Sequence, residues 1–133
     1  DGEIAQSFVF GPALVNDGVL QTDYTEMCMR LVGGYKKTQR QVLCQMDELS
    51  YLIITTEGPE QSQNGGFTVA EIAQLAYDMG AQEAFNLDGG SSAWLCLGTR
   101  RINALRGKKR PISDAIYFIT AEPAYSLGGT TAP

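Results

Sequence analysis

The pattern of apolar positions predicts one clear helix, over residues 69–79. Apolar residues recur there at helical spacing and form a stripe that should face a core: Val69, Ile72, Ala73, Ala76 and Met79. Thr68 precedes the stripe and Glu71 follows three residues later, which is the pattern of a capping box. Gly80 comes directly after the stripe and is a typical helix stop.

Most of the remaining chain consists of short apolar runs between turn residues, which is typical of β-strands. The expected strands are 7–15, 27–32, 41–45, 51–56, 84–87, 93–97 and 115–120. The run Tyr51-Leu52-Ile53-Ile54 is apolar without alternation, so it predicts a central strand that is covered on both faces. The predicted fold class is therefore α+β, a mixed, mainly antiparallel β-sheet with the 69–79 helix packed on it.

The length and composition predict a single domain. With 133 residues and 44% hydrophobic content, the chain can bury one core. We expect this domain at 1–127, followed by a flexible tail at 128–133. No apolar run approaches the roughly 20 residues that span a bilayer, so we expect no membrane span. The start at Asp1 lacks Met and a signal-peptide pattern, from which we expect a soluble chain that is processed or excised from a longer one.

Basic residues gather in one stretch although the net charge is −5. Of the ten basic residues, six lie at 100–110, a stretch without an acid: Arg100, Arg101, Arg106, Lys108, Lys109 and Arg110. This stretch is either a solvated loop or an anion site. The overall acidity and the lack of interleaved aromatic residues argue against a nucleic-acid partner.

The cysteines and the absence of histidine restrict the possible chemistry. Cys28, Cys44 and Cys96 lack the short spacing of zinc or redox motifs, so we expect buried free thiols. Without histidine, the Ser/His and Cys/His nucleophile systems and the commonest zinc ligand are excluded. Acid–base work must then come from carboxylates, tyrosines or lysines. We expect no cofactor, with a divalent cation at Asp88, Asn86 and nearby carbonyls left as an open alternative.

The segment Asn86-Leu87-Asp88-Gly89-Gly90-Ser91-Ser92, the 86–92 loop, has the composition of a ligand-binding loop. Glycines let a backbone approach a bound group, and successive N–H groups can point at an anion. Asp88 follows the predicted strand 84–87 and Glu57 follows the predicted strand 51–56. If these strands are neighbours, both acids lie at one edge of the sheet. Either acid can instead belong to a plain turn.

These residues form a set of candidates with complementary chemistry. Asp88 and Glu57 are the catalytic candidates, since paired carboxylates suit acid–base or nucleophilic work on a glycosidic bond. Arg40 and Arg110 are candidate anion clamps, because guanidinium groups match phosphate oxygens. The other substrate-binding candidates come from the 86–92 loop: Asn86, Gly89, Gly90, Ser91 and Ser92.

Five segments, in this order, resemble the phosphodiester glycosidase family, which includes the uncovering enzyme that removes N-acetylglucosamine from mannose-6-phosphate diesters. The resemblance covers residues 8–119. The five are Phe10-Gly11-Pro12-Ala13-Leu14-Val15 with Asp17-Gly18, Gln39-Arg40-Gln41-Val42, Met79-Gly80-Ala81, the 86–92 loop, and Arg110-Pro111-Ile112-Ser113-Asp114-Ala115.

The resemblance implies an α+β hydrolase that cleaves a sugar 1-phosphodiester, N-acetylglucosamine-linked or part of a cell-surface glycan. It implies a carbohydrate or sugar-phosphate substrate and an extracellular or cell-surface location. Position by position, it assigns the first motif arginine to Arg40 and the late arginine to Arg110. It assigns the motif acid to Asp88 and the glycine turn to Gly89-Gly90. The motif hydroxyl is Ser91 or Ser92. Glu57 stands where relatives often place an Asp-Gly pair.

One family segment has no counterpart, which leaves two alternatives to the enzyme. The family usually begins with an Asn-Gly-Gly-type strand and turn, and nothing before Phe8 matches it. The site would then be completed by a segment outside this chain or by a partner chain. The alternatives are a non-catalytic module that binds a glycan or phosphoglycan, and a fragment of a larger surface polysaccharide protein.

Overall fold

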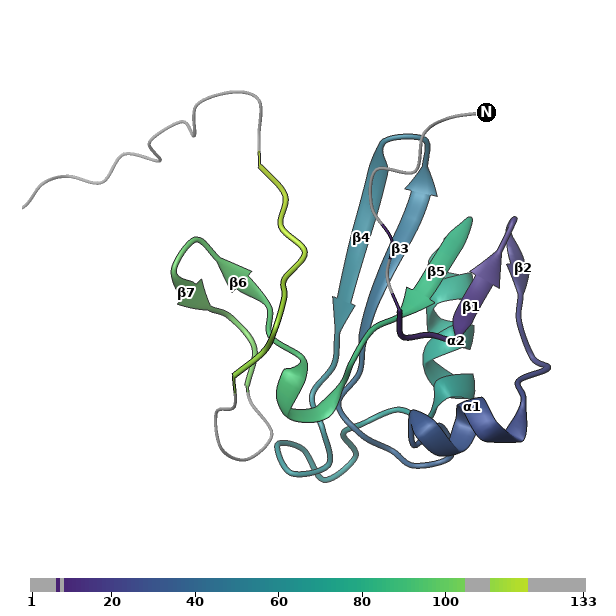
Figure 1. Cartoon of the computed structure of the whole chain (residues 1–133), viewed down its shortest axis with the longest axis horizontal. Coiled ribbons are helices and arrows are strands. Elements are labelled where there is room, and N and C mark those ends of the chain that lie inside the picture. Colours follow the sequence, from purple (N-terminus) through teal and green to yellow (C-terminus); the bar gives the residue numbers. More distant parts are fainter. Residues whose placement is uncertain (1–6, 8, 105–110, 120–133) are drawn as a thin grey trace, which may run out of the picture.

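The computed structural model describes residues 7, 9–104 and 111–119. Within them, five antiparallel strands form one sheet in the order β2-β1-β5-β3-β4, and β6 and β7 form a separate hairpin (Figure 1). In chain order the elements are β1 (Ala13–Asn16), β2 (Val19–Leu20), α1 (Glu26–Leu31), β3 (Gln41–Asp47), β4 (Ser50–Thr55), α2 (Val69–Asp78), β5 (Glu83–Asn86), the 3-10 turn η1 (Gly90–Ser92), β6 (Cys96–Leu97) and β7 (Arg100–Arg101). The α+β class with a mainly antiparallel sheet is confirmed.

Helix α2 forms where its capping residues and apolar stripe predicted it. Thr68 Oγ1 accepts from the Glu71 N–H at 3.2 Å, and the Glu71 carboxylate accepts from the Thr68 N–H at 2.8 Å. The helix ends at Asp78 with Met79 as its C-cap, and Gly80 follows with a φ of +89°. Met79 is exposed, so the expectation that it faces the core is wrong. The buried stripe packs into one core with residues of β1 and β3: Val69, Ile72, Ala73, Ala76, Leu14, Val15, Val42 and Cys44.

The strand expected at 27–32 is wrong, because α1 occupies this part of the chain. Thr25 Oγ1 caps the helix by accepting from the Cys28 N–H at 3.2 Å. Glu26 and Arg30, four residues apart, form an ion pair at 2.8 Å. Only Met29 is buried among the helical residues. The cap, the ion pair and the burial of Met29 therefore outweigh the strand-like composition of this segment. Neither described helix is long and apolar enough to cross a membrane.

Three other expected strands differ from the structure. The run at 7–15 forms a strand only from Ala13 onward, as β1, after a turn at Gly11, which has a φ of +94°. The run at 93–97 contributes only its last two residues, as β6. At 115–120, residues 115–119 are not strand, and Thr120 lies outside the described residues. The expected tail at 128–133 also lies outside them.

The prediction that 51–56 is a central strand is wrong for the described residues, in which β4 is the outermost strand and pairs with β3 alone. Leu52 and Ile54 pack against the core. On the other face, Tyr51 contacts Phe118, with ring centroids 5.8 Å apart. The apolar run is therefore contacted on both faces although it pairs on one side only.

The cysteines are free, but they differ in burial. Cys44 lies in the core, and burial raises the pKa of its thiol to about 11. Cys28 is half-buried and Cys96 is exposed. The expectation of buried thiols is therefore wrong for Cys96, because it lies in a hairpin of two-residue strands outside the main sheet.

Candidate functional site

Strand β3 brings the two candidate carboxylates to one edge of the sheet. It is antiparallel to both β4 and β5, so these two strands run in the same direction, and they end opposite Gln41 and Val42. Glu57 follows the end of β4 and Asp88 follows the end of β5, and both residues are exposed. Two strand spacings separate the strand ends by roughly 10 Å. The two strands are not the neighbours that the sequence expectation assumed, because β3 lies between them, but both acids still follow strands that end at the same edge of the sheet.

The 86–92 loop is fixed to the beginning of β3 by backbone contacts. Gly90 N–H donates to the Gln39 carbonyl at 2.8 Å, and Leu87 N–H donates to the Gln41 carbonyl at 2.8 Å. A Cβ added at Gly89 would lie 2.4 Å from the Gln39 oxygen, which no real side chain tolerates. Glycine is required at this position because the loop backbone lies directly against Gln39 and Arg40, which lead into β3.

Some backbone donors of this loop are used within the protein and others are available. The Gly90 and Ser92 N–H groups donate to the Gln39 and Gly89 carbonyls. Across the described ranges, the N–H groups of Gly89 and Ser91 make no hydrogen bond. Two such donors in one tight turn can bind an anionic oxygen. The Gly89 and Ser91 N–H groups are therefore available donors, and the anion-binding role that the loop composition suggested stays a prediction.

Asn86 is buried and braces the chain at Gly11. Its Nδ2 donates to the Gly11 carbonyl at 2.8 Å, and its backbone oxygen accepts from the Gly11 N–H at 3.0 Å. Its Oδ1 is buried and has no hydrogen-bond partner among the described residues. Buried acceptors are normally paired, so this oxygen is an exception, and the substrate-binding role of Asn86 stays a prediction.

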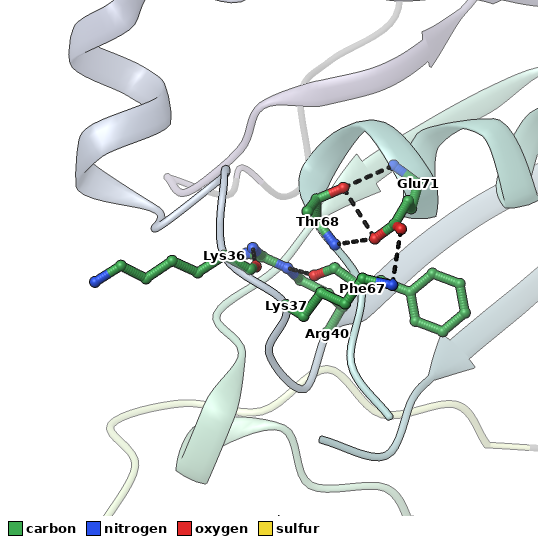
Figure 2. Close-up of polar contacts among 6 residues, drawn as sticks. All are labelled: Lys36, Lys37, Arg40, Phe67, Thr68 and Glu71. Carbon is green, nitrogen blue, oxygen red and sulfur yellow. Dashed lines mark hydrogen bonds and ion pairs between the residues drawn. The ribbon is translucent and has the colours of Figure 1, made fainter. Parts of the chain in front are cut away.

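Arg40 is almost fully buried, with 2% of its surface exposed. Its guanidinium donates to four backbone carbonyls: Nε to Phe67 at 2.9 Å, Nη1 to Val32 at 3.0 Å, and Nη2 to Gly33 at 2.8 Å and Lys36 at 3.1 Å. Figure 2 shows Arg40 with two of these partners, Phe67 and Lys36. No carboxylate in the described part of the chain pairs with it. Burial lowers the pKa of Arg40.

These contacts indicate a structural role for Arg40. Four of the five N–H donors of an arginine are used, and the carbonyls come from the turn after α1 and the segment before α2. Phosphate recognition by arginine needs a free fork of donors. The substrate-binding role of Arg40 stays a prediction, and the geometry favours a tether that joins two loops to β3.

Sequence reasoning missed a polar network beside the loop. Gln41 Nε2 donates to the Trp94 carbonyl at 3.0 Å and to Thr55 Oγ1 at 3.2 Å. Trp94 Nε1 in turn donates to the Ser91 carbonyl at 2.9 Å. The network therefore joins β3 and β4 to the candidate loop. The single tryptophan of the chain, two residues after the loop, was the available signal.

A second group of residues that the sequence did not reveal holds the β6–β7 hairpin beside the Gln41–Trp94 network. Asn103 Nδ2 donates to the Ala93 carbonyl at 2.6 Å, and Asn103 Oδ1 accepts from the Leu95 N–H at 2.8 Å. The Arg101 guanidinium lies 5.6 Å from the centre of the Trp94 ring, a cation–π contact. Part of the basic stretch thus packs at the site, whereas Arg110 lies outside the described residues.

Comparison with known proteins decides the family. The sequence model of the phosphodiester glycosidases matches residues 1–119, which is most of the chain. The chain belongs to the phosphodiester glycosidase family. This confirms the resemblance seen over 8–119 and extends it to the first residue.

A solved structure supports the fold of this phosphodiester glycosidase domain. The chain is similar to a hypothetical protein from Synechocystis, with 24% identity and a TM-score of 0.54 over 72% of this chain and 17% of that one. The likeness concerns the fold alone, and the chain spans less than a fifth of that protein. No curated protein matches the chain. The described residues of this phosphodiester glycosidase domain hold no group of three His, Cys, Asp or Glu side chains that suits a metal ion.

Proposed function

We propose that this phosphodiester glycosidase domain hydrolyses the glycosidic bond of a sugar 1-phosphodiester, either N-acetylglucosamine-linked or part of a cell-surface glycan. The observation that carries the proposal is the position of Glu57 and Asp88, which follow β4 and β5 at one sheet edge. The family match supplies the reaction class. The proposed setting is extracellular or at the cell surface, and no cofactor is part of the proposal.

The residues at this edge can divide the reaction among them. One carboxylate, assigned to Asp88, acts on the anomeric carbon as nucleophile or activates water, and Glu57 is the second carboxylate. The leaving group is a phosphate monoester, which departs as an anion. We assign stabilisation of that anion to the Gly89 and Ser91 N–H groups and the hydroxyls of Ser91 and Ser92, all of which belong to the 86–92 loop. Arg110 remains a predicted clamp.

The test is release of sugar from an N-acetylglucosamine 1-phosphodiester by the full chain and by Asp88→Asn and Glu57→Gln. Both acids are exposed, so the variants should fold, and we expect each to lose roughly 100-fold or more in turnover. Asp47→Asn is the matched control, since Asp47 is an exposed acid at the other end of β3. Turnover of Asp88→Asn equal to the parent would remove Asp88 from the mechanism.

A second candidate function is a module that binds a glycan or phosphoglycan without cleaving it. The engagement of Arg40 by four carbonyls favours it, because this cation is then not available for a phosphate at the edge. Calorimetry that shows sugar-phosphate binding without turnover would support the binding module. Activity that appears only in a longer chain would instead support a fragment of a larger surface polysaccharide protein, in line with the small share of the Synechocystis protein that is matched.

A further inference from the structure

The outer side of β4 is an open strand edge. Thr56 N–H donates to the Arg40 carbonyl at 2.9 Å, and hydrogen-bonding direction alternates along an antiparallel strand. The N–H and C=O groups of Tyr51, Ile53 and Thr55 therefore point away from β3. No described strand pairs with them. A long apolar edge of this kind is unusual in a native protein, and it is a template for one more strand.

The segment 111–119 has the composition of a strand that could pair with this open edge. Its large apolar side chains are between 37% and 84% exposed: Ile112, Ile116, Tyr117, Phe118 and Ile119. β-branched and aromatic residues of this kind favour strands, and clustered exposed apolar residues mark an interaction surface. The segment runs beside β4 in the opposite direction (Figure 1), and the Tyr51 and Phe118 rings are in contact.

We propose that 111–119 pairs with the outer edge of β4 as an additional antiparallel strand, which brings Asp114 to the candidate site. The two segments share the ring contact and no backbone hydrogen bond in the described structure, and the proposed register follows from that contact by taking Phe118 as the residue opposite Tyr51. Counting along the two segments, Ile116 then lies opposite Ile53. The same count places Asp114 opposite Thr55, the last residue of β4. The apolar run at 51–54 then has the two neighbours that its sequence predicts.

This register gives Asp114 a specific partner. Side chains of directly opposed residues lie on one face with Cβ atoms about 4.5 to 5.5 Å apart. Thr55 Oγ1 accepts from Gln41 Nε2, so its hydroxyl hydrogen is free to be donated to the Asp114 carboxylate. Gln41 also donates to the Trp94 carbonyl beside the 86–92 loop. Asp114 is thus a positioning residue at the edge that carries Glu57 and Asp88, a role that rests on the proposed function.

Engineered disulfides test the register without reference to activity. In a full-length chain carrying Cys28→Ser, Cys44→Ala and Cys96→Ser, the pair Ile53→Cys with Ile116→Cys should form an intrachain disulfide at least tenfold faster than a matched pair shifted by one residue, Ile53→Cys with Ala115→Cys. Opposed strand residues meet the Cα distance that a disulfide requires, and the shifted pair points to opposite faces. Equal rates, or disulfides only between two chains, would overturn the proposal.

Amide hydrogen exchange of the intact chain tests the pairing without new cysteines. The Ile53 and Thr55 N–H groups should be protected in the parent chain. Ile116→Pro should remove that protection, because the Ile116 N–H would point at β4, whereas Ala115→Pro should retain it, because the Ala115 N–H would point away. Exchange of Ile53 in the parent as fast as in an unstructured peptide would overturn the pairing.

A double-mutant cycle tests the positioning role on the active enzyme. Asp114→Asn and Thr55→Val should each lower kcat several-fold with little change in KM, and the double variant should be no slower than either single variant. Additive losses would show that Asp114 does not act through Thr55. If the parent chain has no turnover, the proposed function fails, whereas the disulfide and exchange results still decide the pairing.

Discussion

The carbonyl oxygen of Gln39 accepts a hydrogen bond from the Gly90 N–H at 2.8 Å, and this contact fixes the 86–92 loop on the beginning of β3. The same oxygen leaves no room for a side chain on Gly89. The adjacent residue, Arg40, directs its side chain to the carbonyls of two other loops. Two consecutive residues just before β3 thus order both the candidate loop and its supports.

We predict that Gly89→Ala will lower both stability and turnover. The added carbon would lie 2.4 Å from the Gln39 oxygen, so the loop must shift away from β3. Overpacking of this kind costs about 1 to 3 kcal/mol, and urea unfolding measures it. Gly98→Ala is the control, since its φ of +58° adds backbone strain while its added carbon meets no atom within 4 Å. Equal effects of the two variants would argue against the contact.

We predict that Arg40→Met will destabilise the protein by about 3 kcal/mol or more in urea unfolding. The variant removes four hydrogen bonds from a charged group and leaves carbonyls without their donors. Arg30→Met is the control, because its ion pair with Glu26 is exposed and contributes little.

The same variant separates the two roles considered for Arg40. A structural tether predicts that stability falls first and that sugar-phosphate binding falls only as the folded fraction falls. Unchanged urea unfolding with weakened sugar-phosphate binding in calorimetry would instead assign Arg40 to the substrate.

We predict an acid-side loss of stability that depends on Glu71. The hydrogen bond from the Thr68 N–H, followed by the Lys37 ammonium 3.0 Å away, lowers the pKa of this carboxyl from its usual 4.5. Because the folded-state pKa is the lower one, the stabilisation is present above pH 4.5 and is lost as the pH falls through the folded-state pKa. Thermal unfolding from pH 7 to pH 3 should show a shallower acid decline in Glu71→Gln, and an identical decline would contradict the assignment.

The sequence predicted a secondary-structure element correctly where residues within that element specify it. The capping box of Thr68 and Glu71 and the apolar stripe after it specify α2 within one segment. The segment at 27–32 failed because its apolar residues suit a strand, whereas the Thr25 cap and the burial of Met29 decide for a helix.

The sequence by itself determined the α2 helix and the composition of the 86–92 loop, because each is a property of neighbouring residues, and it pointed to the family through five segments in a fixed order. Only the tertiary structure decided where Arg40 directs its guanidinium and which atoms surround Gly89, since their partners lie far away in the sequence. It also decided that Glu57 and Asp88 share one edge, because that depends on β3 pairing with both β4 and β5. Strand pairing joins distant segments, and the order of strands in a sheet is not encoded in any one of them.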